Sequence, residues 1–301
     1  MPKTNLEEMA AKFRVPHDKK FRLKDYEPGW AGDEDVPKAD RKKFAEKILA
    51  ASVAELAEAQ ERLYASDTWS VLVILQAMDA AGKDGTIKHV MSGVNPQGCQ
   101  IFSFKQPSAE ELDHNYLWRY WRALPERGRI GIFNRSYYEE VLVVRVHPEL
   151  AHAERIPNAE IDGSFWADRF EDINNLERHL TRNGTKVLKF FLNISRREQR
   201  ERFLKRLEDP SKLWKFSPSD VAERGYWDDY MKAYEEAIDA TSTKWAPWYV
   251  IPADHKWVAR AIVSHTIAKA VHDLNPKYPE VGPEKLAAIE AARKQLEDEK
   301  G

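Results

Sequence analysis

The fold is decided by the stretch Ser70-Val71-Leu72-Val73-Ile74-Leu75-Gln76-Ala77-Met78-Asp79-Ala80-Ala81-Gly82-Lys83-Asp84-Gly85-Thr86. Its first seven residues are rich in β-branched and leucine side chains, and the run is too short for a free-standing buried helix, so it predicts a strand. A glycine-containing turn follows, and a helix follows the turn. This order of strand, turn and helix presents backbone N–H groups to an anion at the helix N-terminus.

Four more short apolar runs predict strands at residues 100–105, 129–133, 186–194 and 248–251. Amphipathic helices lie between them in the sequence. Alternation of strands and helices at this spacing implies an α/β fold, with a mostly parallel sheet and helices on both faces. Ligands of such sheets bind beyond the carboxyl ends of the strands, which is where the turn after the first strand lies.

Two capping-box signatures place the starts of helices. Ser108 with Glu111 precedes an amphipathic segment that is expected to continue as a helix to near Pro125. Ser195 with Glu198 precedes a helix that is expected to end near residue 207. Asp254 is expected to cap the last helix of the core, over residues 256–274.

The chain divides into three parts by composition. Residues 1–38 are polar and contain four prolines, which predicts an extended arm that lies on the body without forming a core. A single main domain is predicted over 39–275, and it starts with a long amphipathic helix over 39–65. Residues 276–301 form a polar tail, either an exposed helix or partly disordered.

Composition limits the possible classes of protein. The 301 residues carry a formal charge of −2, and 43% are hydrophobic, so the chain is globular and not disordered. A polyanion site must therefore come from local clustering of cations, and no nucleic-acid partner is expected. No apolar run reaches the roughly 20 residues that span a bilayer, the first residues lack a hydrophobic signal segment, and Cys99 is the only cysteine. We expect a cytoplasmic protein without a membrane partner.

The turn after the first strand resembles the phosphate-binding pattern G-x-x-x-x-G-K-[ST]. It matches at Gly82 and Lys83 and departs at Ala77 and Asp84. Gly82 and Gly85 allow close approach of the backbone to an anion, and Lys83 adds a charge for phosphoryl oxygens. The alternative is a tight βα turn with a capping aspartate. The predicted phosphate- and nucleotide-binding residues of this loop are Ala80, Ala81, Gly82, Lys83, Asp84, Gly85 and Thr86.

The third predicted strand delivers Asn134 and Arg135 to the same edge of the sheet. If a magnesium ion binds at this edge, Asn134 is a weaker ligand for it than an aspartate would be, because its side chain is neutral. Asp79 is then expected to be the main ligand of the ion. Arg135 is placed to stabilise charge on a transferring phosphoryl group. The alternative is that both residues simply cap the end of a strand.

A basic helix follows Ser195 and is predicted to begin a lid over about residues 196–225, which would bring cations to phosphates and exclude water. A solvated helix face with i, i+4 ion pairs is the alternative. The residues predicted to bind polyanion from the lid and its surroundings are Lys88, Arg200, Arg206, Lys212 and Lys215.

Three segments together resemble the polyphosphate kinase 2 family. They are residues 78–88, residues 133–139 and residues 212–217, in the order found in the family, and the resemblance covers about 12–275. Residues 141–148, with Asn134, are similar to the subgroup that phosphorylates both AMP and ADP. The resemblance implies a three-layer α/β/α P-loop kinase-like core with a helical lid, Mg²⁺ as cofactor, and a homodimer or homotetramer.

The resemblance also implies roles for single residues. Asp79 matches the loop aspartate that binds magnesium and helps to activate the attacking oxygen, and Lys83 and Arg135 match phosphate-binding residues, so these three are the predicted catalytic residues. Asn134, Glu139 and Arg145 are predicted to assist in binding nucleotide or phosphate.

The expected activity is magnesium-dependent, reversible transfer of the terminal phosphoryl group of inorganic polyphosphate to AMP or ADP, with ATP as a product. One alternative is an ATP-dependent nucleotide kinase on the same fold. Another is a non-catalytic regulator that binds nucleotide. A third and more remote alternative is a non-catalytic scaffold that binds a polyanion.

Overall fold

Five parallel strands form the centre of the structure, a computed structural model that describes residues 10–32 and 36–299. Their spatial order is β2-β3-β1-β4-β5, so that β1 lies in the middle of the sheet. The strands are β1 Ser70–Gln76, β2 Cys99–Ser103, β3 Ile130–Asn134, β4 Thr185–Asn193 and β5 Trp248–Pro252. All five predicted strands are confirmed, with bounds that differ by at most two residues.

The register of the sheet sets the place of the functional residues. Leu75 of β1 lies opposite Asn134 of β3, and Gln76 lies opposite Phe191 of β4. Every residue of β1 is buried, as expected for a parallel strand that is covered on both faces. The turn after β1 and the turn after β3 therefore emerge side by side at the carboxyl edge.

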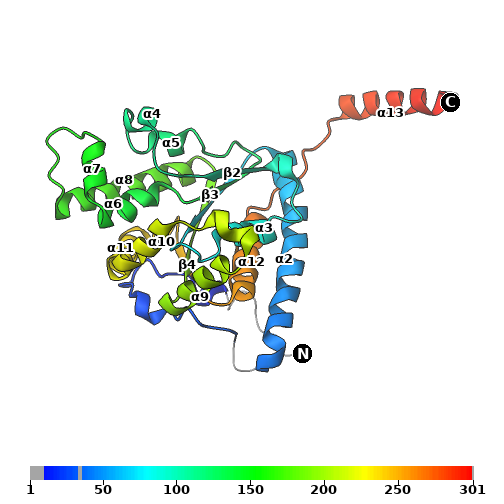
Figure 1. Ribbon diagram of the computed structural model, residues 1–301. Coiled ribbons are helices and arrows are strands. Elements are labelled where there is room, and N and C mark those ends of the chain that lie inside the picture. The colour runs from blue at the N-terminus through cyan, green and yellow to red at the C-terminus, as the bar shows by residue number, and fades with distance from the viewer. Residues whose placement is uncertain (1–9, 33–35, 300–301) are drawn as a thin grey trace.

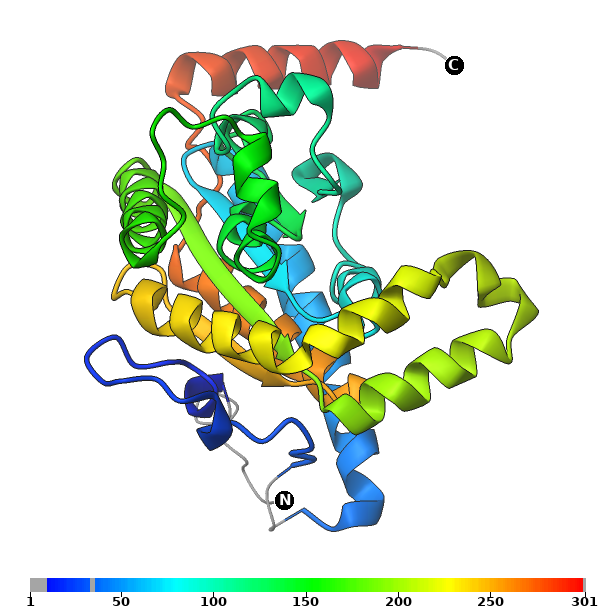
Figure 2. The ribbon, with the colours of Figure 1, turned by 60° about the vertical axis from the view of Figure 1, so that its left-hand side comes forward.

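Helices cover both faces of the sheet and confirm the three-layer α/β/α architecture (Figures 1 and 2). On one face, α12 (Lys256–Asp273) packs along α2 (Lys38–Ser66) and against α3 (Lys83–Val90). On the other face, α8 (Gly163–Arg182) packs on β4, and α11 (Trp227–Thr241) packs on α8. The long helix predicted over 39–65 corresponds to α2.

The remaining helices are short except for α9 and α13. They are η1 Leu23–Asp25, η2 Pro96–Gly98, α4 Ala109–Leu112, α5 Trp118–Trp121, η3 Tyr137–Val141, α6 Val143–Val146, α7 Glu149–Ala153, α9 Arg196–Leu207, η4 Pro210–Lys215, α10 Pro218–Glu223, η5 Arg224–Tyr226 and α13 Pro283–Asp298. The capping box at Ser108 is present, but the segment after it forms two short helices, α4 and α5, where one was expected. The Asn115 side chain accepts the Leu117 N–H at 2.9 Å, and such local bonds compete with a continuous helix.

Ser195 caps α9 as predicted, since its side chain accepts the Glu198 N–H at 3.1 Å. The prediction for Asp254 is wrong. His255 is the N-cap residue of α12 and makes no side-chain capping bond, while Asp254 Oδ1 accepts the Ser195 N–H at 2.7 Å. Asp254 thus joins the start of the basic helix to the end of β5.

The N-terminal arm contributes to the core, contrary to expectation. Phe13, Val15 and Phe21 are buried within the main hydrophobic cluster. Val15 donates its N–H to the Trp248 carbonyl at 2.9 Å, and Val250 donates to the Phe13 carbonyl at 2.9 Å. The arm thereby covers the edge strand β5, whose backbone would otherwise be exposed. Residues 1–9 and 33–35 of the predicted arm lie outside the described residues.

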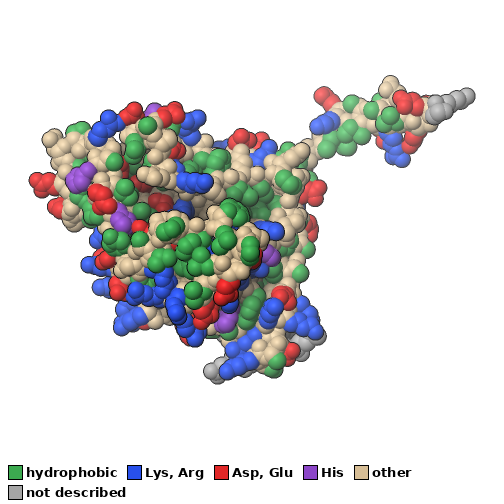
Figure 3. Space-filling view, in the orientation of Figure 1, with side chains coloured by type: hydrophobic (Ala, Val, Ile, Leu, Met, Phe, Trp, Pro, Cys, Tyr) green, Lys and Arg blue, Asp and Glu red, His purple; other side chains and the backbone are tan. Residues whose placement is uncertain are grey.

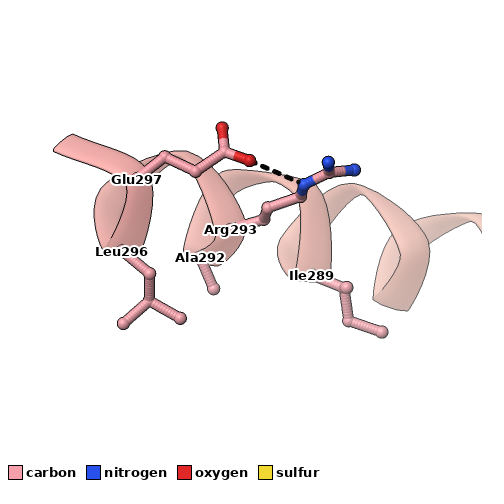
Figure 4. A pocket seen from close by; sticks show the side chains of 5 residues that line it. All are labelled: Ile289, Ala292, Arg293, Leu296 and Glu297. Carbon is pink, nitrogen blue, oxygen red and sulfur yellow. Dashed lines mark hydrogen bonds and ion pairs between the residues drawn. The ribbon is translucent and has the colours of Figure 1, made fainter.

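The predicted exposed tail contains α13, which stands away from the sheet and has no buried residue (Figure 1). A shallow depression on it is lined by Ile289, Ala292, Arg293, Leu296 and Glu297 (Figure 4). All five side chains come from this one helix, so the depression does not meet any residue of the carboxyl edge. Within the described part of the chain, no helix combines the length and apolarity needed to cross a bilayer.

Candidate phosphate-binding site

The loop between β1 and α3 turns through two left-handed residues. Ala80 has φ +60° and Gly82 has φ +109°, and only Gly82 adopts this conformation without a steric cost. A left-handed alanine is strained backbone of the kind that concentrates at functional sites. The loop delivers the chain into α3, whose first N–H groups have no acceptor within the helix and can bind an anion.

Lys83 folds back over this loop. Its Nζ donates to the carbonyl oxygen of Ala77 at 2.8 Å, across the turn. Burial lowers the pKa of Lys83 to about 8, with the positive charge of Arg135 as the next contribution. The ammonium group is therefore held against the start of the loop, partly stripped of water.

Arg135 is the second cation at this edge, and it joins two carboxylates. Its Nη2 lies 2.7 Å from Asp79 Oδ1, and its Nη1 lies 3.0 Å from Glu139 Oε2. The Glu139 carboxylate, and Asp79 after it, raise the pKa of Arg135, so the guanidinium is charged at any pH of interest. Arg135 has φ +67°, which is a second strained residue in the same place.

Asn134 contacts the loop from β3. Its Nδ2 donates to Asp84 Oδ1 at 2.8 Å. Lys215 Nζ lies 3.9 Å from Asp84 Oδ2, so Asp84 lies between the end of β3 and the predicted lid. The structure thus brings together predicted residues from three separate segments.

A small cavity opens between the loop, the turn after β3 and the helices that follow β4. Asp79, Arg135 and Glu139 line it, together with residues that sequence reasoning did not single out, namely Gln199, Asp220, Glu223, Arg224, Tyr230 and Tyr234. The i, i+4 spacing of the two tyrosines shows only that they share a helix face. No local pattern in the sequence links these residues to a turn more than 100 positions earlier.

The predicted lid forms a helical hairpin of α9, η4 and α10 that projects from the body (Figure 2). Arg206 donates to the Lys215 carbonyl at 3.1 Å, and Lys212 forms an ion pair with Asp209, so these cations are engaged within the hairpin. Arg200 is exposed on α9. Figure 3 shows Lys and Arg side chains gathered around the part of the surface where Figure 1 places α9 and the arm. Action as a lid stays a prediction.

Two predicted residues lie apart from this arrangement. Arg145 of α6 pairs with Glu236 of α11, and its guanidinium lies 5.2 Å from the Trp166 ring centroid. It is not among the residues that line the cavity. Lys88 is exposed in the last turn of α3. Buried Thr86, in contrast, belongs to the first turn of α3 directly behind the loop.

The donor set around Asp79 is compatible with magnesium. Among the described residues no group of three or more Asp, Glu, His or Cys side chains could enclose a metal ion. Mg²⁺ does not require such a cage, because it commonly keeps several waters and is held by one or two carboxylates and by substrate phosphates. Asp79 and Asp84 are the loop carboxylates that could serve.

Strand, turn, lysine and helix, together with an arginine from the adjacent strand, define a protein of the P-loop kinase-like class. A sequence profile of the polyphosphate kinase 2 (PPK2) family matches residues 38–279. The chain belongs to the PPK2 family.

Individual relatives extend over most of the chain. It is 55% identical to an ADP-polyphosphate phosphotransferase of Rhodopseudomonas palustris, over 86% of this chain and 90% of the relative. It is 44% identical to an AMP/ADP-polyphosphate phosphotransferase of Meiothermus ruber, over 89% of this chain and 95% of that relative. The crystal structure of polyphosphate kinase 2 from Arthrobacter aurescens TC1 superposes with a TM-score of 0.81 at 41% identity, covering 92% of this chain and 95% of that one.

Proposed function

We propose that the protein transfers the terminal phosphoryl group of inorganic polyphosphate to ADP or AMP. The observation that carries this proposal is the convergence of Asp79, Lys83 and Arg135 at one carboxyl edge, in a chain of the PPK2 family. The relatives named for ADP and for AMP/ADP support these two acceptors. Both names include ADP, and the second also includes AMP.

The reaction is an in-line displacement. An oxygen of the terminal nucleotide phosphate attacks the end phosphorus of the chain, the bridging P–O bond breaks, and the electron pair stays on the shortened polyphosphate. Lys83 and Arg135 stabilise the charge that develops on the transferring group and on the leaving oxygen. The backbone N–H groups at the start of α3 bind the phosphate that remains in the loop.

Asp79 would hold Mg²⁺, with substrate phosphates and water as the other ligands. When bound, the ion neutralises phosphate charge and orients the phosphoryl group. Asp79 is ion-paired with Arg135 in the structure, so an incoming phosphate that binds Arg135 would free the carboxylate for this role. We propose that the transfer depends on magnesium.

The hairpin of α9 to α10 would close over the site and carry cations to the polyanion. Lys215 Nζ lies 3.9 Å from Asp84 Oδ2, and this contact between the hairpin and the first turn of α3 supports such a closure. Because a polyphosphate chain carries about one charge per unit, its binding should weaken as salt rises. We also propose a homodimer or homotetramer in the cytoplasm.

Incubation with ADP, magnesium and long-chain polyphosphate, in the absence of ATP, tests the function. ATP should appear, and the Lys83→Ala variant should lose most of this turnover. Formation of product only when ATP is the donor to a nucleoside monophosphate would instead identify an ordinary nucleotide kinase. Tight binding of nucleotide with no transfer from either donor would identify a regulator. Parallel reactions with AMP, ADP, GMP and GDP would establish the acceptor.

A further inference from the structure

Three consecutive backbone carbonyls of the phosphate-binding loop are held by side chains of α9. Gln199 Nε2 donates to the Asp79 carbonyl at 2.9 Å. Arg202 Nη1 donates to the carbonyls of Ala80 and Ala81, at 3.1 and 2.7 Å. These contacts join residues about 120 positions apart in the sequence.

The Arg202 guanidinium is fully engaged and buried. Its Nη2 donates to the Ala253 carbonyl at 2.6 Å and to the Asp254 carbonyl at 2.9 Å, at the end of β5. Its Nε donates to Glu198 at 2.8 Å, and the residue is only 7% exposed. Arg202 therefore has no N–H group left for a phosphate, unlike the exposed cations of the same helix. It connects the loop after β1 with the turn after β5.

These contacts decide where the N–H groups of the loop point. In a planar trans peptide the carbonyl and the N–H point in opposite directions. The carbonyls of Asp79 and Ala81 share peptides with the N–H groups of Ala80 and Gly82. When α9 holds those carbonyls on its own side, the two N–H groups are directed away from α9. Fixed N–H dipoles bind an anion without a further cost of reorganisation.

We propose that Arg202 is a positioning residue for the loop, assisted by Gln199, and that it keeps the strained turn ready for phosphate. This inference rests on the proposed function only in assigning a phosphate to the loop. Gln199 Oε1 also accepts a hydrogen bond from Arg224, which lies in η5 at the end of the hairpin. Gln199 thereby contacts both the loop and the segment in which the hairpin returns to the body.

The Arg202→Lys variant tests the proposal, because lysine keeps the charge but cannot reproduce the planar set of five donors. Arg169→Lys is a matched control. Arg169 is also buried, and it pairs with Glu140 and Glu154 outside the loop and the cavity. Isothermal titration calorimetry with tripolyphosphate and with ADP, both in magnesium, gives the affinities. Urea unfolding gives the stability of each variant.

We expect both variants to lose stability, but only Arg202→Lys to bind at least one of the two ligands about tenfold more weakly. Affinities of Arg202→Lys that equal those of Arg169→Lys for both ligands would overturn the proposal. If Arg202→Lys does not fold, Gln199→Met removes the contact with the Asp79 carbonyl, together with the hydrogen bond from Arg224, and leaves the contacts of Arg202 in place. It should weaken binding about threefold, and unchanged binding would overturn the proposal.

The two proposals can fail separately. Wild-type synthesis of ATP from polyphosphate, combined with equal affinities of Arg202→Lys and Arg169→Lys, would remove the positioning role and leave the function. Absence of that synthesis, combined with weaker ADP binding by Arg202→Lys, would remove the function and leave the positioning role.

Discussion

Asp79 and Arg135 follow two adjacent strands and form an ion pair, with 2.7 Å between Oδ1 and Nη2. One is the predicted metal ligand and the other is a predicted phosphate ligand. Arg135 is also bound to Glu139, so its guanidinium is oriented before any ligand arrives. The pair holds both groups at the carboxyl edge, and a phosphate that displaces the carboxylate would exchange one anionic partner of Arg135 for another.

The Asp79→Asn variant should reduce kcat/KM by at least about 100-fold, because it removes the carboxylate charge and leaves the size of the side chain unchanged. Rates measured over a wide range of magnesium concentrations check this. Asp172→Asn, an exposed carboxylate of α8, is the control and should stay within about twofold. A rate for Asp79→Asn near that of wild type at high magnesium would show that Asp79 is not the metal ligand.

Lys83 should make phosphate binding sensitive to alkaline pH. Burial and Arg135 lower the pKa of Lys83 to about 8 in the free protein, so the ammonium is charged below that pH and becomes neutral above it. The Kd for tripolyphosphate should therefore rise by up to about tenfold per pH unit above 8. Calorimetric titrations between pH 6.5 and 9.5 measure it. Lys83→Arg should bind with little change over this range, because arginine stays charged. Wild-type affinity that is flat through pH 9.5 would contradict the role of this charge.

Asn134 should matter less than Asp79. Asn134→Ala removes one hydrogen bond to Asp84, and we expect its loss in kcat/KM to be smaller than that of Asp79→Asn. Asn134→Asp would instead place two carboxylates within hydrogen-bonding distance, and like charges this close repel. This variant should need less magnesium for half-maximal rate, because a divalent cation relieves this repulsion and an aspartate is a stronger magnesium ligand than an asparagine. A larger loss in kcat/KM for Asn134→Ala than for Asp79→Asn would show that Asp79 is not the more important of the two residues.

A buried ion pair supports the turn that carries Arg135 and Glu139. Lys189 and Glu177 are both fully buried, with 2.6 Å between Nζ and Oε2, and Tyr138 of η3 bonds to both. Lys189→Met should lower the free energy of unfolding by about 3–5 kcal/mol, because Glu177 is left as an uncompensated buried charge. Urea unfolding measures this loss.

The double variant Lys189→Met, Glu177→Gln should recover part of the lost stability, since it removes the unpaired charge and keeps an acceptor for the tyrosine hydroxyls. A single variant as stable as wild type would show that the pair does not stabilise the core.

Sequence reasoning placed the loop and all five strands because their signals are local. A buried parallel strand such as β1 is indicated by a short run of apolar residues. The turn after it is indicated by glycine and lysine at fixed offsets. Arg135 was found for the same reason, since it directly follows β3. The sequence pattern of the α4–α5 segment is helical and predicts one helix. The hydrogen bond from the Leu117 N–H to Asn115 competes with that helix, and the pattern does not reveal it.

By itself the sequence determined the α/β architecture, the turn between β1 and α3, and which residues form the basic helix α9, because each depends on residues that are neighbours in the chain. Only the tertiary structure decided what the basic residues do. Arg202 and Arg200 look alike in the sequence, yet one is buried against the carbonyls of Ala80 and Ala81 while the other is exposed. The partner of a guanidinium is set by which distant backbone groups the packed sheet brings within hydrogen-bonding distance, and no local pattern carries that information.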